Sequence, residues 1–253
     1  MEKRIYGLVG EKLSHSRSVQ IHEMLGNPRY CLFELATAEL EAFFERSDIA
    51  GVNVTIPYKR DVLRFCSGLS PEAEETGAVN TMVKSDGGYI GYNTDLFGFE
   101  YMLSRAGIVL SGKKLLVLGS GGASHTVCTV AKRLGAAEIV VISRAGEENY
   151  DNLGRHSDAQ IIVNATPVGM YPDVDSSPVS LELFPKCEGV ADLVYNPART
   201  GLLKDAEARG IPNTNGLSML VAQAKEAEEL FFGRVLPEAV IEHAIRLMEE
   251  KML

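Results

Sequence analysis

Short apolar segments alternate with segments of helical periodicity along the chain. In residues 50–56 the apolar side chains of Val52 and Val54 alternate with the polar side chains of Asn53 and Thr55, which is the pattern of a β-strand with two different faces. Similar apolar runs predict further strands at residues 4–10, 29–35, 79–84, 89–93, 113–118, 138–143, 159–166 and 188–195. This alternation is typical of an α/β fold in which helices cover a sheet.

Helices are predicted between these strands. Residues 94–107 have Thr94 as a cap and Gly107 at the C-terminal end, and Thr37 suits the start of a helix over residues 37–47. Further helices are expected at residues 18–25, 70–78, 215–233 and 237–250.

The two halves of the chain differ in pattern. Residues 85–88, Ser-Asp-Gly-Gly, are a hairpin signal, so the N-terminal sheet is expected to mix parallel and antiparallel strands. From residue 113 the order becomes strand, glycine turn, helix and strand, which is the βαβ unit of a nucleotide-binding sheet. A chain of 253 residues also lies where single cores usually give way to two domains, so two domains are expected.

Composition and charge argue against several classes of function. The net charge is −9 and basic residues form no run, which disfavours a nucleic-acid or anionic-membrane surface. The first ten residues reach a glycine too soon for a signal peptide and no stretch approaches a membrane span, so a cytoplasmic location is expected. The four cysteines and five histidines have no metal-ligand spacing, and no metal site is expected.

The segment Gly119–Ala123, with the sequence GSGGA, follows a predicted strand and opens a helix. Glycines in such a turn let the backbone approach a pyrophosphate, whose charge the helix N-terminus can hold. The alternative is a turn that only lets strand and helix pack. Arg144 stands where NAD enzymes usually carry a carboxylate, which favours NADP because a guanidinium can hold a 2′-phosphate. The alternative for Arg144 is a solvated loop arginine.

Two charged residues follow predicted strands that carry polar neighbours. Residues 50–56 are followed by Pro57, Tyr58 and Lys59, where a purely structural exit would more often use Gly, Asn or Asp. We expect Lys59 to lie beside a cleft and to handle a proton, with Asp95 orienting it. The alternatives are a solvated lysine for Lys59 and a helix cap for Asp95.

Eight short motifs together resemble the shikimate dehydrogenase family. In chain order they are SHSRS, NVTIPYK, GAVNT, GYNTD, GSGGA, NATPVGM, DLVYNP and NGLSMLVAQA. The resemblance implies an N-terminal α/β domain with a mixed sheet that binds substrate, a C-terminal Rossmann-type domain that binds NADP, and a cleft between them. The expected bounds are 1–100 for the first domain and 101–235 for the second, with a helix at about 236–253 packing back on the first.

The resemblance also implies the reaction and the residues of the site. The reaction is the reversible NADPH-dependent reduction of 3-dehydroshikimate to shikimate, in the pathway to aromatic amino acids, with Lys59 and Asp95 as the catalytic pair. The two serines of SHSRS match positions that bind the substrate carboxylate. The full set of implied substrate-binding residues is Ser16, Ser18, Thr55, Lys59, Asn80, Asp95, Tyr195 and Gln223. The implied cofactor-binding residues are Gly119, Ser120, Gly121, Gly122, Ala123, Arg144, Thr166, Leu193, Gly216 and Met219.

The chain departs from the family pattern in two places. Val19 replaces the usual proline after the second serine, and SRAGEEN has only Arg144 where the family has a second arginine. The missing second arginine bears on the preference for NADP over NAD, not on the reaction. Two alternatives stay open: a quinate/shikimate dehydrogenase with relaxed use of NAD and NADP, and a dinucleotide-sensing protein without turnover. A folate-linked NADP dehydrogenase is less consistent with the two serines. The expected partners are a small anionic cyclic hydroxy acid and, as one option, a second copy of the chain.

Overall fold

The computed structural model describes residues 4–14 and 16–252. His15 of the SHSRS motif lies outside the described residues, as do residues 1–3 and 253 at the ends of the predicted domain ranges. The chain divides into two compact units. The first comprises residues up to 95 together with 221–251, and the second comprises residues 96–220.

The first unit contains a six-stranded sheet in the order β2-β1-β3-β5-β6-β4. Its strands are β1 (Ile5–Gly10), β2 (Tyr30–Glu34), β3 (Ile49–Val54), β4 (Cys66–Leu69), β5 (Thr81–Ser85) and β6 (Gly88–Tyr92). β1 pairs in parallel with β2 and β3, whereas β5 is antiparallel to β3 and β6. The prediction of a mixed sheet is confirmed. β4 was not predicted, because its sequence, Cys-Ser-Gly-Leu, has no alternation of apolar and polar residues.

The helices of the first unit begin and end close to the predicted positions. They are α1 (Ser18–Met24), α2 (Leu40–Phe44), α3 (Pro71–Thr76), α7 (Leu217–Phe232) from residue 221 onward and α8 (Ala239–Met252), with 3₁₀ turns at Thr37–Glu39 and Asp61–Phe65. The predicted helix over residues 37–47 starts as a 3₁₀ turn. There the Glu39 carboxylate accepts a hydrogen bond from the Ala36 N–H at 2.7 Å.

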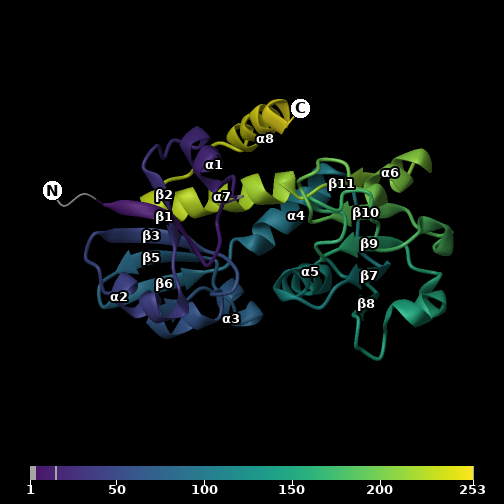
Figure 1. The fold of residues 1–253 in the computed structure, drawn as a ribbon, viewed down its shortest axis with the longest axis horizontal. Coiled ribbons are helices and arrows are strands. Elements are labelled where there is room, and N and C mark those ends of the chain that lie inside the picture. Colours follow the sequence, from purple (N-terminus) through teal and green to yellow (C-terminus); the bar gives the residue numbers. More distant parts are fainter. Residues whose placement is uncertain (1–3, 15, 253) are drawn as a thin grey trace. The chain divides into compact units, whose positions relative to one another are not determined.

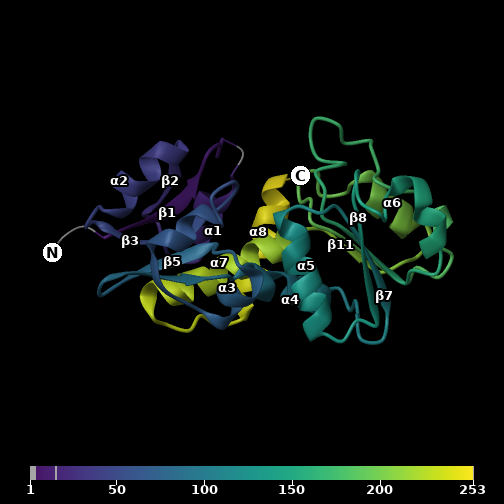
Figure 2. The ribbon, with the colours of Figure 1, turned by 90° about the horizontal axis from the view of Figure 1, so that it is seen from below.

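Strand alternation gives this sheet two apolar faces. On β1, Val9 joins a core with Phe43 and Phe44 of α2, whereas Tyr6 and Leu8 point to the other face. That second face is covered by α7. Figure 1 shows the strands of this sheet from β2 at the top to β6 at the bottom, and in the turned view of Figure 2 α2 and α7 lie on opposite sides of the sheet. β1 accordingly has no charged residue and is buried along almost its whole length, as expected of a strand that is covered on both faces.

The second unit contains a five-stranded parallel sheet in the order β11-β10-β9-β7-β8. Its strands are β7 (Lys114–Leu118), β8 (Glu138–Ile142), β9 (Ile161–Asn164), β10 (Gly189–Asp192) and β11 (Asn213–Thr214). The chain runs from β7 outward to β8 and then returns to β9 on the other side of β7. This reversal of strand order is the point where doubly wound sheets bind ligands.

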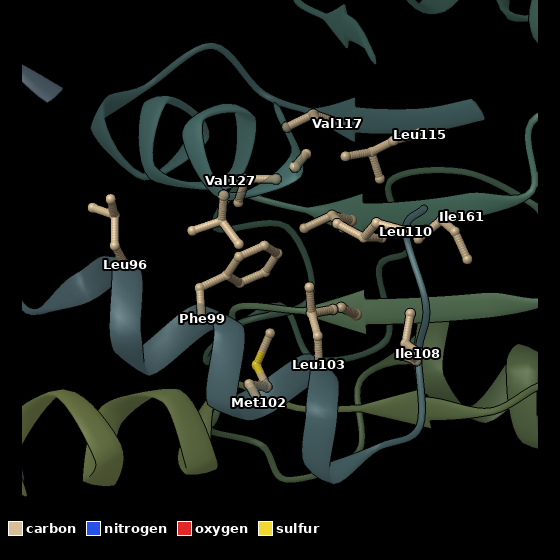
Figure 3. Close-up of a cluster of buried hydrophobic side chains, with 14 residues drawn as sticks. Leu96, Phe99, Met102, Leu103, Ile108, Leu110, Leu115, Val117, Val127 and Ile161 are labelled. Carbon is tan, nitrogen blue, oxygen red and sulfur yellow. The ribbon is translucent and has the colours of Figure 1, made fainter. Parts of the chain in front are cut away.

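Helices cover both faces of the parallel sheet. They are α4 (Asp95–Arg105) from residue 96 onward, α5 (Gly122–Arg133) and α6 (Gly201–Ala208), with 3₁₀ turns at Tyr150–His156 and Leu181–Leu183. Figure 3 shows Phe99, Met102 and Leu103 of α4 in one buried cluster with Val127 of α5 and the strand residue Val117. The opposite face packs against α6, and α5 and α6 lie on either side of the strands in Figure 2.

Three further features concern the described part of the chain. None of its helices has the length and apolar content needed to cross a membrane. Its histidines, cysteines and acidic residues form no cluster of three that could hold a metal ion. All four cysteines are free thiols, and Cys31 is exposed on β2.

An acidic side chain is half-buried on α7 near other carboxylates. Burial, together with the negative charges of Glu72 and Glu229, raises the pKa of Glu226 to about 7, against a smaller opposing effect of Lys225. Lys225 is held by Glu229 at 2.7 Å, which limits how far it can compensate Glu226. The folded protein therefore binds a proton at Glu226 in a pH range where the unfolded chain has lost it.

We expect Glu226→Gln to stabilise the protein at pH 8. A pKa raised from 4.5 to about 7 corresponds to roughly 3 kcal/mol. Because the folded-state pKa is the higher one, the wild type has its full stability below pH 4.5 and loses this part as the pH rises through 7. The gain in the free energy of unfolding should be largest at pH 8 and vanish near pH 4.5, as measured by urea denaturation.

The control is Glu238→Gln, which removes the same charge from an exposed position beyond α7. It should change the free energy of unfolding by less than about 0.5 kcal/mol at every pH. A pH-independent difference between wild type and Glu226→Gln would contradict the raised pKa.

Candidate active site

In the first unit, two parallel strands end level with each other. The register pairs Val9 of β1 with Val54 of β3, so the segments that follow them start from the same edge of the sheet. The Thr55 N–H still bonds to the Val9 carbonyl at 2.9 Å, and a Cβ on Gly10 would lie 2.7 Å from the Thr55 methyl group. The loops that carry the two predicted serines, Thr55 and Lys59 therefore begin side by side.

The predicted strand over residues 50–56 ends early, at Val54, and the chain then turns. The Tyr58 N–H donates to the Thr55 carbonyl at 3.0 Å, and Ile56 is 76% exposed rather than part of the sheet. The Tyr58 side chain is fully buried, and its hydroxyl donates to the Leu35 carbonyl at 2.5 Å. An aromatic residue at this strand exit thus anchors the turn, and the next residue, Lys59, is held next to that anchor.

Ser16 and Ser18 lie together at the start of α1. The Ser16 hydroxyl donates to the Ser18 hydroxyl at 3.1 Å, and its oxygen accepts the Ser18 N–H at 3.2 Å. Both side chains are half-buried, and Arg17 in the cap position makes no side-chain capping bond. Ser16 thus satisfies a backbone donor at the start of α1, and the pair also places two hydroxyls next to each other.

Lys59, Asp95 and Asn80 meet in one hydrogen-bonded group. The Lys59 ammonium donates to Asp95 Oδ2 at 2.5 Å, and the Asn80 amide donates to Asp95 Oδ1 at 2.9 Å. The Lys59 and Asp95 side chains are 30% and 14% exposed, so solvent reaches the pair. Since an ammonium has three donors and Asp95 uses one, two remain for other acceptors.

A threonine connects this group to α7. Thr94 Oγ lies 3.0 Å from the Asn80 amide nitrogen and 3.5 Å from Gln223 Oε1. The structure therefore brings together Lys59, Asn80, Asp95 and Gln223, which come from three distant parts of the sequence. Sequence reasoning gave Thr94 only a capping role.

Sequence reasoning also missed two buried polar residues on the neighbouring strands. Asn53 of β3 is 5% exposed and Thr81 of β5 is fully buried, and their side chains bond to each other at 2.9 Å. The available signal was Asn53 itself, because an asparagine inside an apolar strand needs buried hydrogen-bond partners.

In the second unit, four parallel strands end level with one another. The register aligns Leu118 of β7 with Ile142 of β8 and Asn164 of β9, and it aligns Asn164 with Asp192 of β10. The segments after these strands carry the predicted residues Gly119–Ala123, Arg144, Thr166, Leu193 and Tyr195. These residues therefore follow one edge of the sheet, at the point where the strand order reverses.

The glycines of the turn differ in whether the packing of the fold requires them. Gly119 has φ +104°, and a Cβ there would lie 2.8 Å from the Thr166 methyl group, so the fold itself needs this glycine. A Cβ at Gly121 or Gly122 would meet no atom within 4 Å. Those two glycines border open space at the N-terminus of α5, where the first N–H groups have no partner within the helix.

Arg144 is exposed and is the second residue after β8. Burial raises the pKa of the Tyr150 phenol, and the positive charge of Arg144 opposes that rise, which places the guanidinium near this ring. Glu148 from the same loop is bound to His156 at 2.8 Å.

A buried aspartate organises the ends of β9 and β10. Asp192 is fully buried, and its carboxylate accepts hydrogen bonds from the Asn164 amide at 2.9 Å, the Thr200 hydroxyl at 2.7 Å and the Val194 N–H at 3.0 Å. Burial raises the pKa of Asp192, and these three donors oppose the rise. Asn164 Oδ1 in turn accepts from the Thr166 N–H and hydroxyl at 3.0 and 2.6 Å. Asp192 thus orients Asn164, and Asn164 orients Thr166.

Gly216 packs directly on the segment after β10. A Cβ at Gly216 would lie 2.1 Å from the Leu193 carbonyl oxygen, so no larger residue fits without a shift of the backbone. Leu193 and Met219 both pack against the core cluster of α4 and α5. Tyr195 is half-buried two residues beyond Leu193. These four predicted residues belong to the second unit, whereas Lys59, Asp95, Asn80 and Gln223 belong to the first.

These features define a class: a two-unit α/β protein with a doubly wound parallel sheet, a glycine turn and a lysine–aspartate pair. Comparison with known proteins gives the particular family. A family model described as the shikimate dehydrogenase substrate binding domain matches residues 8–82, and one described as the shikimate 5′-dehydrogenase C-terminal domain matches residues 216–246.

Whole-chain relatives agree with these matches. The shikimate dehydrogenase (NADP(+)) of Clostridium beijerinckii is 38% identical over 246 residues, which cover 89% of this chain and 91% of that protein. The crystal structure of a chorismate mutase/shikimate 5-dehydrogenase fusion protein from Clostridium acetobutylicum has a TM-score of 0.95 at 37% identity and covers 100% and 99% of the two chains. The shikimate 5-dehydrogenase of Thermus thermophilus, crystallised with NADP(H) and shikimate, has a TM-score of 0.85 at 32% identity and covers 96% and 98%. The chain belongs to the shikimate dehydrogenase family.

We expect Asn164→Asp to destabilise the protein at pH 7. The substitution keeps the shape of the side chain but places a second carboxylate 2.9 Å from the buried Asp192, where two negative charges repel each other. The free energy of unfolding should fall by at least about 3 kcal/mol at pH 7. The loss should shrink as the pH falls toward 5, because the folded variant takes up a proton at this pair. Urea denaturation at several pH values measures both effects.

Asn196→Asp makes the same chemical change at an exposed position of the same unit and serves as the control. It should alter the free energy of unfolding by less than about 0.5 kcal/mol. Equal stability of the Asn164→Asp variant and the wild type at pH 7 would show that Asp192 does not depend on the Asn164 amide.

Proposed function

We propose that the chain catalyses the reversible, NADPH-dependent reduction of 3-dehydroshikimate to shikimate. The observation that carries this proposal is the Lys59–Asp95 pair, an ammonium oriented by a carboxylate that is itself held by Asn80. The pair is partly exposed, as a group that must meet substrate has to be. The names of the relatives support the substrate and the cofactor.

The protein's own groups supply orientation, charge and a proton. When NADPH is bound, it supplies the hydride. Lys59 donates a hydrogen bond to the ketone oxygen as negative charge builds there, and its proton goes to the resulting alkoxide. Asp95 keeps the ammonium in place through this step, and the partial exposure of Lys59 lets solvent return the proton.

The remaining residues of the first unit bind the substrate in this proposal. The hydroxyls of Ser16 and Ser18, 3.1 Å apart, suit the two oxygens of a carboxylate. The ring hydroxyls are assigned to Thr55, Asn80 and Gln223. Tyr195 of the second unit is assigned to the substrate on the family pattern alone.

The second unit binds NADP in this proposal, and its residues fit that group. The open space at Gly121 and Gly122 lets a pyrophosphate approach the N-terminus of α5. The exposed Arg144 suits a 2′-phosphate. The nicotinamide is assigned to the segments with Thr166, Leu193, Gly216 and Met219, with Ser120 and Ala123 completing the glycine turn. The first unit is accordingly proposed as the substrate-binding and catalytic domain, and the second as the NADP-binding domain.

The alternatives receive less support. Relaxed use of NAD has in its favour the missing second arginine of the segment SRAGEEN, which does not bear on quinate. A dinucleotide sensor without turnover would have no use for the oriented Lys59–Asp95 pair. We also propose a cytoplasmic location, from the class of reaction. A homodimer stays a prediction, which light scattering of the purified protein can test.

Turnover is measured directly by loss of NADPH absorbance. We expect turnover with 3-dehydroshikimate and none with 3-dehydroquinate or without substrate. Lys59→Ala should lower kcat by at least about a hundredfold with a smaller change in KM, because the lysine acts as charge develops in the transition state.

Lys84→Ala, which removes an exposed lysine from β5, is the matched control and should retain wild-type kcat. Unchanged kcat in Lys59→Ala would end the catalytic role of this residue. Turnover of 3-dehydroquinate at a comparable rate would favour the relaxed enzyme instead.

The glycine turn allows a separate test of the cofactor site. Gly121 has φ −79° and ψ −173°, which any residue can adopt, and a Cβ there meets no protein atom. Gly121→Val should therefore keep the melting temperature while weakening NADPH binding by at least about tenfold, because the side chain fills the space that the pyrophosphate needs. Fluorescence titration with NADPH measures the affinity without turnover. Wild-type affinity in a folded Gly121→Val variant would place the pyrophosphate elsewhere.

A further inference from the structure

A line of buried hydrogen bonds runs through the first unit and ends on the Asp95 carboxylate. It passes through Tyr30 of β2, Asn53 of β3, Thr81 of β5 and then Asn80. These four side chains are 4%, 5%, 0% and 3% exposed, so water does not compete for their donors and acceptors. Only Asn80 among them was expected to contact substrate.

The first bond of the line sets the orientation of Asn53. The Tyr30 hydroxyl donates to Asn53 Oδ1 at 2.6 Å. Burial raises the pKa of Tyr30 well above its ordinary value, and the charge of Glu228 adds to the rise, so the hydroxyl keeps its proton. Because Oδ1 of Asn53 faces this donor, its amide nitrogen must face the other way, toward Thr81.

The next two bonds fix the hydroxyl of Thr81. Its oxygen accepts from the Asn53 amide at 2.9 Å, so its own proton is available for Asn80 Oδ1 at 3.1 Å. The Thr94 N–H also donates to Asn80 Oδ1, at 2.8 Å. With its oxygen occupied by donors, Asn80 presents its amide N–H groups to Thr94 Oγ at 3.0 Å and to Asp95 Oδ1 at 2.9 Å.

The far end of the line is itself held rigidly. The Tyr30 ring stacks on His22 with 3.7 Å between ring centroids and 5° between planes. His22 is bound to Glu228 of α7, and the Asn27 amide donates to the same Glu228 oxygen at 2.9 Å. Both His22 and Glu228 are buried, so the Tyr30 ring has little freedom to turn its hydroxyl away from Asn53.

We propose that Asn53 and Thr81 are positioning residues for the reaction, with Tyr30 as the donor that sets their direction. Each bond in the line has its donor on the Tyr30 side, so the line delivers a donor to Asp95 Oδ1 and leaves Oδ2 for Lys59. This inference rests on the proposed function, because positioning matters only if Lys59 acts on a substrate. A buried polar cluster with only a structural role would affect stability but would not need to affect kcat.

Thr81 offers the sharpest substitution, because valine has its shape without the hydroxyl. We expect Thr81→Val to lower kcat by about tenfold, through misplacement of Asn80 and Asp95, with a much smaller change in the KM for 3-dehydroshikimate. Thr81→Ser keeps the hydroxyl and should retain most of the wild-type kcat. A purely structural role predicts that kcat per folded molecule is the same in both variants, so thermal unfolding of each is measured alongside.

Tyr30→Phe tests the origin of the line, because it keeps the ring on His22 and removes only the hydroxyl. We expect Tyr30→Phe to lower kcat by less than Thr81→Val does, again with little change in KM, because the Thr94 N–H still holds Asn80. Tyr89→Phe is the matched control. It removes a hydroxyl from another buried tyrosine of the same sheet, which lies 3.5 Å from the Ile49 carbonyl and outside this line. The control should retain wild-type kcat.

Two kinetic results would overturn the inference in an active enzyme: wild-type kcat in a folded Thr81→Val variant, or equal loss of kcat in Thr81→Val and Thr81→Ser. If the wild type does not turn over 3-dehydroshikimate, the proposed function fails, and a crystal structure of Thr81→Val then decides the inference separately. The inference predicts that the 2.9 Å contact between Asn80 and Asp95 is lost or lengthened in that structure. An unchanged arrangement of Lys59, Asn80 and Asp95 would overturn it.

Discussion

The Asp95 carboxylate is the point on which the first unit's site depends. Asp95 is the first residue of α4. Its two carboxylate oxygens accept hydrogen bonds from Asn80 and Lys59, which come from different loops. A lysine side chain has four flexible bonds and loses much conformational entropy when it is held in one position. The carboxylate offsets that cost with a charged hydrogen bond, and Asn80 prevents the carboxylate from turning away.

The two units use the same local arrangement for different purposes. In each, a buried asparagine donates to an aspartate at 2.9 Å while its oxygen accepts a backbone N–H and a threonine hydroxyl. Asp95 is partly exposed and paired with a cation, whereas Asp192 is fully buried and accepts from the uncharged donors of Asn164, Val194 and Thr200. Burial accordingly raises the pKa of Asp192. The first arrangement presents a charged group to solvent, and the second holds together the loops at the end of a parallel sheet.

The glycines of the second unit also fall into two groups: some are required by the fold, and others are not required by packing. Gly119 and Gly216 are required by the fold, because a side chain there would collide with Thr166 or with the Leu193 carbonyl. Gly121 and Gly122 are not required by packing, since a Cβ would meet no protein atom. A glycine that the fold does not need is best explained by a ligand that approaches the backbone, which is why the turn before α5 supports a nucleotide site.

The sequence by itself determined the α/β class, the mixed and parallel sheets and most elements, because strands and helices bury their side chains with periods of 2 and 3.6 residues. β4, β11, α6 and the 3₁₀ start at Thr37 were not predicted. β4, β11 and the 3₁₀ turn are too short to show a periodic apolar pattern. The sequence also indicated Lys59, Asp95 and Asn80 through the family motifs. Only the tertiary structure decided that Tyr30, Asn53 and Thr81 form the line of hydrogen bonds that leads to Asn80. The reason is that side chains of β2, β3 and β5 come within hydrogen-bond distance of one another only when the sheet assembles.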